Sequence, residues 1–164
     1  MKKTIIFIDG ANIFYTQKKI KFTINWFKVK RLLSKEYKIR GIYYYTGIKE
    51  GDLKMKKYLN YLNKLDIQTI TKPLKLIKDE KGKIIFKSNC DVEICVDILT
   101  KIDEFDNLIL FSGDSDFVYL LRILKEKYNK KIIIYSSRRT ISWEIKLVVD
   151  KYIFLEDIKN LIER

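Results

Sequence analysis

Short apolar runs alternate with amphipathic segments along the chain. The first run, residues 4–8, is continuous and rich in β-branched residues, which predicts a strand buried on both faces. Residues 13–18 then predict a short helix, and Trp26, Val29 and Leu33 lie on one face of a second helix. Further strands are expected at 39–46, 67–71, 107–111, 131–135 and 152–155, and further helices at 52–64, 91–102, 115–127, 142–149 and the C-terminus.

This alternation predicts an α/β fold of the three-layer, Rossmann-like kind. Parallel strands need crossover connections, so we expect a mostly parallel central sheet with helices on both faces. Residues 74–78 and 83–86 flank a turn sequence at 79–82 that ends in glycine, which predicts a β-hairpin excursion at 73–87. With 164 residues, the chain is expected to form a single domain, 1–164.

The predicted helix at 91–102 carries several apolar residues. Its core side is expected to be formed by Val92, Cys95, Val96 and Leu99. The two cysteines of the chain are five positions apart in this region, a spacing that neither forms a disulfide easily nor resembles a zinc knuckle. We therefore expect both to be reduced, mostly structural thiols.

Composition restricts the chemistry that the chain can perform. Lys and Arg number 34 against 21 Asp and Glu, a net charge of +13 that attracts polyanions such as nucleic acid, although a coding bias towards lysine explains the excess equally well. The absence of histidine excludes Ser-His-Asp triads, Cys-His pairs, histidine general bases and His-ligated zinc. The N-terminal apolar run is too short for a signal peptide or a membrane span, so a cytoplasmic protein is expected.

Four aspartates fall where the predicted fold brings strand ends and helix starts together. Asp9 ends the first strand, and Asp114 follows the strand expected beside it. Asp116 lies in the helical turn after Asp114, and Asp91 begins a helix at the same edge. In doubly wound sheets, ligands bind outside the carboxyl ends of the strands, where the strand order reverses. Taken singly, Asp9 is explained by a turn and the others by helix caps, so only their coincidence indicates a site.

Converging carboxylates repel one another and need a positive partner. Two unit charges about 4 Å apart cost about 4 kcal/mol at an effective dielectric constant near 20. Without histidine or a thiolate cluster, an all-oxygen site suits Mg²⁺ or Mn²⁺, which also accept phosphate oxygens as ligands. Such an ion activates bound water and neutralises charge on a phosphodiester, so nuclease chemistry is expected.

Basic and aromatic residues near the same edge are candidate nucleic-acid contacts. The basic candidates are Lys72, Lys75, Lys87, Arg138 and Arg139, followed by Lys49, Lys54, Lys56 and Lys57. Tyr43, Tyr44 and Tyr45 offer a stacking surface, although at least half of them should be core in a strand. Asp97 lies six residues into the helix that Asp91 begins, roughly 9 Å further from the crevice, so a supporting or structural role is expected.

Three ordered motifs contain the four aspartates. They are Ile-Asp-Gly-Ala-Asn at 8–12, Lys-Ser-Asn-Cys-Asp-Val-Glu-Ile-Cys-Val-Asp at 87–97, and Phe-Ser-Gly-Asp-Ser-Asp-Phe at 111–117. Together with the sequence at 149–152 they resemble NYN domains, particularly the LabA-like branch of the PIN-like nuclease superfamily. The resemblance covers essentially the whole chain.

The resemblance implies a PIN-like fold, an Mg²⁺- or Mn²⁺-dependent ribonuclease activity, and metal binding by the four aspartates. It also implies supporting roles for Asn12, beside the first acid, and Ser112, before the aspartate pair. Ser88 stands where many relatives have glycine, a change that removes no ligand.

Two other functions stay open beside a ribonuclease. A noncatalytic RNA-binding or regulatory NYN module would bind RNA in a salt-sensitive way without cutting it. A phosphoaspartyl phosphatase or response-regulator-like protein is the weakest alternative, because the second aspartate and the threonine that it needs after Asp9 are missing. RNA is the expected partner, and the sequence leaves room for a homodimer.

Overall fold

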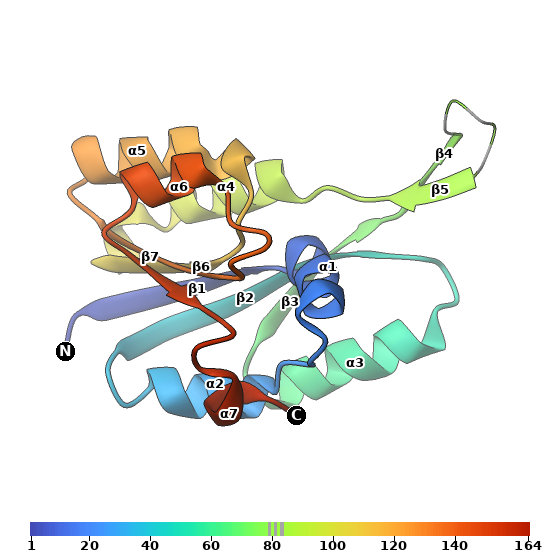
Figure 1. Ribbon diagram of the computed structural model, residues 1–164, viewed down its shortest axis with the longest axis horizontal. Helices are drawn as coiled ribbons and strands as arrows, with labels where there is room; N and C mark the ends of the chain where they lie inside the picture. Colours follow the sequence, from blue (N-terminus) through green and yellow to red (C-terminus); the bar gives the residue numbers. More distant parts are fainter. Residues whose placement is uncertain (79, 81, 83) are drawn as a thin grey trace.

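A six-stranded parallel sheet forms the centre of the computed structural model, which describes residues 1–78, 80, 82 and 84–164 (Figure 1). Its strands are β1 (Lys3–Asp9), β2 (Lys38–Ile48), β3 (Gln68–Pro73), β6 (Asn107–Phe111), β7 (Lys131–Ser136) and β8 (Lys151–Phe154). They lie in the order β3-β2-β1-β6-β7-β8, and each neighbouring pair is parallel. The prediction of an α/β fold with a mostly parallel sheet is confirmed.

Helices cover both faces of the sheet (Figure 1). One face is packed by α1 (Gly10–Ile20), α2 (Trp26–Leu33), α3 (Leu53–Lys64) and α7 (Lys159–Ile162). The other is packed by α4 (Asp91–Thr100), α5 (Val118–Glu126) and α6 (Trp143–Val148). A short 3₁₀ helix, η1 (Ile102–Glu104), follows α4. Another, η2 (Ser115–Phe117), precedes α5, where the sequence predicted one continuous helix at 115–127. In the described part of the chain, no helix is long and apolar enough to cross a membrane.

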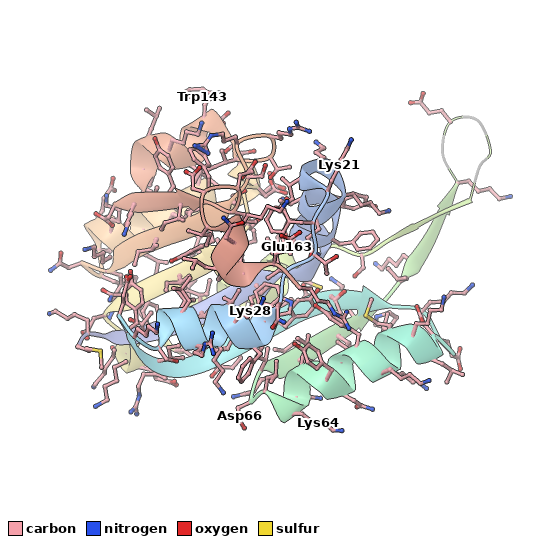
Figure 2. The ribbon with its side chains drawn as sticks, turned by 60° about the horizontal axis from the view of Figure 1, so that its bottom comes forward. Lys21, Lys28, Lys64, Asp66, Trp143 and Glu163 are labelled. Atoms are coloured by element: carbon pink, nitrogen blue, oxygen red, sulfur yellow. The ribbon has the colours of Figure 1, made fainter. Side chains whose placement is uncertain are left out.

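The central strand β1 is buried on both faces because its alternating side chains enter two different cores. Ile6 and Ile8 pack in the core that contains Trp26, whereas Ile5 and Phe7 pack in the core beneath α4 and α5. On the first face, Lys28 of α2 also donates a hydrogen bond of 2.8 Å to the backbone carbonyl of Glu163 (Figure 2). This contact ties the C-terminal segment to α2.

The buried side of α4 differs from the prediction, because Cys95 alone of the four residues named there packs against the core. Ile94 and Ile98 are fully buried, whereas Val92, Val96 and Leu99 are 71%, 52% and 40% exposed. Both sets have helical spacing, and positions two residues apart lie about 200° apart around a helix. Burial of the isoleucine pair therefore turns the valines towards solvent.

The hairpin region lies outside the main sheet. Strands β4 (Lys75–Lys78) and β5 (Ile84–Lys87) form a separate antiparallel pair that extends away from the body of the molecule (Figure 1). Of the turn predicted at 79–82, positions 79 and 81 lie outside the described residues, as does 83. The side chains of 76, 77 and 84–87 are likewise outside the description.

The strand order reverses between β1 and β6, which pair in parallel up to Ile8 and Phe111. The carboxyl ends of these two strands therefore open one crevice, the place where such sheets bind ligands. Helix α1 begins directly at this crevice because Gly10 permits a close approach. A Cβ atom on Gly10 would lie 2.5 Å from the backbone oxygen of Tyr45. The glycine thus fixes the start of α1 against β2.

Candidate functional site

Three carboxylates meet at the crevice from three separate segments. Asp91 is the first residue of α4, Asp114 follows β6, and Asp116 lies in η2. One carboxylate oxygen from each of them lies within 4.8 Å of the others. Asp91 and Asp114 are half-buried and Asp116 is exposed, so the group opens to solvent on one side.

Asp9 adjoins this group but is not one of the three. Its side chain is 5% exposed and caps α1, accepting a hydrogen bond of 3.1 Å from the backbone N–H of Asn12. The hydroxyl of Ser112 donates to its other oxygen at 3.0 Å. Burial, opposed by these two hydrogen bonds and reinforced by the charges of Asp91 and Asp114, raises the pKa of Asp9 to about 6. The carboxylate is therefore poorly stabilised as an anion.

Asn12 and Ser112 connect the start of α1 to the loop that carries Asp114. The Asn12 side-chain oxygen accepts from the backbone N–H of Gly113 at 3.2 Å. Ser112 accepts from the backbone N–H of Asp114 at 3.2 Å while it donates to Asp9. The positions predicted as supporting residues thus hold the two strand ends in register.

In the described part of the structure the three-carboxylate group is not paired with a basic side chain, although the charge of Lys72 acts on Asp91 from its ion pair with Glu93. Among the described residues, none of the ion pairs involves these aspartates. Burial raises the pKa of Asp91, a side-chain hydrogen bond with Asn89 opposes this, and the charges of Asp114 and Asp116 add to the rise. The Asn89 side-chain oxygen also accepts the backbone N–H of Asp91 at 2.7 Å. An all-oxygen donor set with unrelieved repulsion fits a hard divalent cation.

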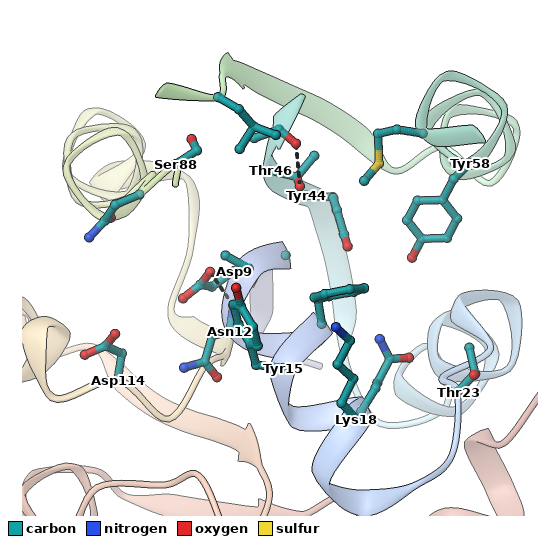
Figure 3. Close-up of a pocket in the computed structure, with 18 of the residues that line it drawn as sticks. Asp9, Asn12, Tyr15, Lys18, Thr23, Tyr44, Thr46, Tyr58, Ser88 and Asp114 are labelled. Carbon is teal, nitrogen blue, oxygen red and sulfur yellow. Dashed lines mark hydrogen bonds between the residues drawn. The ribbon is translucent and has the colours of Figure 1, made fainter. Parts of the chain in front are cut away.

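The acids form one end of a groove of about 1150 Å³ (Figure 3). This is larger than the pocket of roughly 300–1,000 Å³ that a small ligand needs. The rest of the groove is lined by aromatic and basic side chains from α1, β2, α3 and the ends of nearby segments. They include Phe14, Tyr15, Tyr44, Tyr58, Lys18, Lys21, Lys54 and Arg164. The groove therefore places these side chains and the acids along one continuous surface.

Comparison with known proteins identifies the family. The model of the NYN domain matches residues 3–156. The chain belongs to the NYN domain family. It is 32% identical, over 97% of its own length and 87% of the relative's, to the low amplitude and bright protein LabA of Synechococcus elongatus. The crystal structure of a protein of unknown function from Vibrio parahaemolyticus shares the fold, with a TM-score of 0.85, 21% identity, and coverage of 99% of this chain and 96% of that one.

Several predicted nucleic-acid contacts of this NYN domain are engaged within the protein. Lys72 forms an ion pair of 2.6 Å with Glu93 and donates to the backbone oxygen of Asn89 at 3.1 Å. Lys75 is exposed on β4, whereas the side chain of Lys87 lies outside the described part of the structure. Of the wider set, only Lys54 is among the described residues that line the groove.

The two predicted arginines are used in other contacts. Arg138 donates to both carboxylate oxygens of Asp157, at 2.8 and 3.0 Å, and lies 4.2 Å from the ring centre of Phe154. Arg139 donates to the backbone oxygen of Lys19 at 3.0 Å. Neither arginine is among the described residues that line the groove.

Asp97 and the tyrosine triplet have structural environments. Asp97 accepts a hydrogen bond of 2.6 Å from the hydroxyl of Tyr45, whose pKa is raised by burial and by this contact. Tyr43, Tyr44 and Tyr45 are all buried, so the predicted stacking surface is part of the core. Only Tyr44 of the three lines the groove.

Sequence reasoning missed the aromatic and basic residues of α1. Phe14, Tyr15, Lys18 and Lys21 line the groove, yet they fall in or just after a segment read only as a short helix. The available signal was their spacing, because residues three or four apart share one side of a helix.

Proposed function

We propose that this NYN domain is a metal-dependent ribonuclease that hydrolyses RNA phosphodiester bonds. The observation that supports it best is the convergence of oxygens from Asp91, Asp114 and Asp116 within 4.8 Å, with none of the three in an ion pair among the residues that the structure describes. These three side chains would hold Mg²⁺ or Mn²⁺, because both ions prefer oxygen ligands and keep positions open for phosphate.

The chemistry of this site divides between the ion and the protein. A bound divalent ion lowers the pKa of water and offsets charge on a phosphodiester. The three aspartates orient the ligand positions, and Asp9 contributes a fourth negative charge to the same crevice. Asn12 and Ser112 keep the two loops together through their hydrogen bonds with Gly113 and Asp9.

The charge of the chain favours a polyanionic substrate. The net charge is +13, so RNA is attracted to the protein although the catalytic group itself is acidic. The basic residues that line the groove, Lys18, Lys21, Lys54 and Arg164, supply this attraction next to the acids. A cytoplasmic location and a homodimer stay predictions of the sequence.

The test is cleavage of labelled single-stranded and structured RNAs with Mn²⁺ and with EDTA. We expect cleavage with Mn²⁺ only, and a loss on the order of 100-fold in Asp114→Asn, since a ligand of the ion that would offset the charge of the reacting phosphate is removed. Asp157→Asn is the matched control, because Asp157 pairs with Arg138 away from the groove. Equal cleavage by the wild type and Asp114→Asn contradicts the proposal.

The alternative is a noncatalytic RNA-binding module, which the aromatic and basic residues among the groove lining also support. In that case RNA binding is salt-sensitive and persists in EDTA and in Asp114→Asn, while no preparation cuts RNA. The same labelled RNAs, measured by anisotropy and by gel, separate the two functions.

A further inference from the structure

Two neighbouring aromatic side chains on α1 are exposed inside the groove. Phe14 is 51% exposed and Tyr15 is 60% exposed, and both line the groove. Their rings meet edge to face, with centroids 5.6 Å apart and planes at 74°. The pair contributes little to either core, so its apolar surface remains available to a ligand.

Lys18 lies against these rings. Its ammonium nitrogen is 4.2 Å from the ring centre of Phe14 and 5.8 Å from that of Tyr15. Cation–π attraction of this kind holds the lysine beside the aromatic faces. Among the described residues, no ion pair involves Lys18, so its charge is not offset by a carboxylate.

Helix α1 leads from the acids along the groove. Asp9 caps the helix, and Tyr15 lies six residues further on, roughly 9 Å away at 1.5 Å per residue. Figure 3 shows Asp9, Asn12, Tyr15 and Lys18 following one another along this helix. Lys21 caps the C-terminus of α1 and projects from the surface in Figure 2. It lines the groove beyond the other residues. A strand with its phosphate at the acids would therefore pass the aromatic pair next.

We infer that Phe14, Tyr15 and Lys18 form a base-stacking subsite that selects single-stranded RNA, with the rings contacting a base and Lys18 a phosphate. The inference rests on the proposed function for the identity of the polymer. Stacking on aromatic side chains is tolerant of sequence because every base has a π-face. In a duplex those faces are already stacked on neighbouring bases, so a paired strand gains nothing from the rings.

The chain provides close controls for each aromatic residue. Phe27 on α2 is 52% exposed and has Arg31 over its ring at 6.0 Å, which reproduces the Phe14–Lys18 arrangement away from the groove lining. Tyr119 on α5 is 75% exposed and is the counterpart of Tyr15. All four substitutions to alanine remove exposed rings, so similar small effects on folding are expected.

The experiment measures binding by fluorescence anisotropy in the full-length Asp114→Asn background, which keeps the RNA intact. The three probes are a single-stranded RNA, an abasic strand of equal length and charge, and an RNA duplex. Phe14→Ala and Tyr15→Ala should each weaken binding of the single strand about tenfold. The abasic strand should change by less than about twofold. Phe27→Ala and Tyr119→Ala should leave all three affinities unchanged.

Three results overturn the inference: equal losses for the base-containing and abasic strands, equal losses in the control variants, or tighter binding of the duplex than of the single strand. The outcome is separable from the proposed function. If the wild type cuts no RNA but the aromatic substitutions selectively weaken single-strand binding, the ribonuclease proposal fails and the subsite stands. If RNA is cut and the substitutions have no effect, only the subsite fails.

Discussion

The carboxylates at the amino edge of the parallel sheet have different contacts from those at its carboxyl edge. At the amino edge, Asp106 accepts the backbone N–H of Lys3 at 2.9 Å. Asp150 accepts the N–H of Ile132 at 2.7 Å and pairs with Lys125 at 3.1 Å. At the carboxyl edge, three carboxylates face one another within 4.8 Å. The acids at the amino edge thus bind the backbone of neighbouring strands, whereas the three at the carboxyl edge could hold a metal ion.

The pKa values of Asp150, at the amino edge, and Asp91, at the carboxyl edge, are shifted in opposite directions. Burial raises the pKa of Asp150, but the Ile132 hydrogen bond and the Lys125 charge outweigh it and bring the pKa below its usual value. The pKa of Asp91 is raised, first by burial and then by its acidic neighbours. Ionisation of Asp150 therefore stabilises the folded state, and ionisation of Asp91 destabilises it.

The largest change in the free energy of unfolding is expected from the substitution of Asp9. Its pKa rises from 3.8 to about 6 on folding, so the neutral carboxyl stabilises the fold below pH 4 and this contribution is lost as the pH rises through 6. Ionisation then costs on the order of 3 kcal/mol. We expect metal-free Asp9→Asn, which keeps a capping oxygen, to be more stable than the wild type at pH 8 and similar at pH 4. Urea unfolding in EDTA at both pH values measures this.

A metal should reverse the penalty at the carboxyl edge. Mn²⁺ at 100 times its dissociation constant stabilises a protein that binds it only when folded by about 2.7 kcal/mol. We expect the thermal unfolding midpoint of the wild type to rise with Mn²⁺ concentration and to respond much less in Asp116→Asn. Asp150→Asn should keep the full response, and an equal response in all three proteins would place the binding elsewhere.

The sequence predicted the strands and the acids because both have strong local signals. The run at 5–8 is apolar at every position, Asp9 ends this strand and Asp114 follows another buried strand, so the topology alone brings them to one edge. The buried side of α4 was not predictable in this way. Ile94 with Ile98 and Val92 with Val96 have the same spacing, and only tertiary packing decides between them.

The residues that line the groove were harder to predict for a related reason. The choice of Arg138 considered its loop position, but its partner Asp157 is 19 residues away and follows another strand. Phe14 and Tyr15 gave no signal of exposure, because aromatic residues in a helical segment usually pack in a core. Pairing and exposure are properties of the assembled chain, and local patterns do not contain them.

A smaller effect is expected at the amino edge. The pKa of Asp150 is lowered on folding, so its contribution is present above the unfolded value of 3.8 and is lost as the pH falls through the folded one. Asp150→Asn should destabilise the protein at pH 7 by about 1 kcal/mol, since the charge-assisted hydrogen bonds to a partly exposed side chain are weakened. The loss should shrink in acid, opposite to the trend for Asp9→Asn. Chemical unfolding of the wild type and Asp150→Asn at pH 7 and pH 3 measures this. If the stability change followed pH in the same direction as for Asp9→Asn, the two edges would not differ.

The smallest effect is expected from Asp157→Asn. It tests whether the behaviour of a carboxylate depends on its edge of the sheet or on its ion pair. Asp157 lies near the carboxyl edge but has a cationic partner, and the side chains of Arg138 and Asp157 are 52% and 54% exposed. Exposed pairs contribute about 0–1 kcal/mol, so Asp157→Asn should barely change stability or the Mn²⁺ response.

RNA affinity shows whether the Arg138–Asp157 pair keeps the arginine from binding RNA. If Arg138 is held away from RNA only by Asp157, releasing it should tighten binding at low salt, and Arg138→Ala should cancel that gain. We expect neither change, because Arg138 also lies on Phe154 and stays clear of the groove. A gain measured by anisotropy would make the arginine a contact that the carboxylate masks.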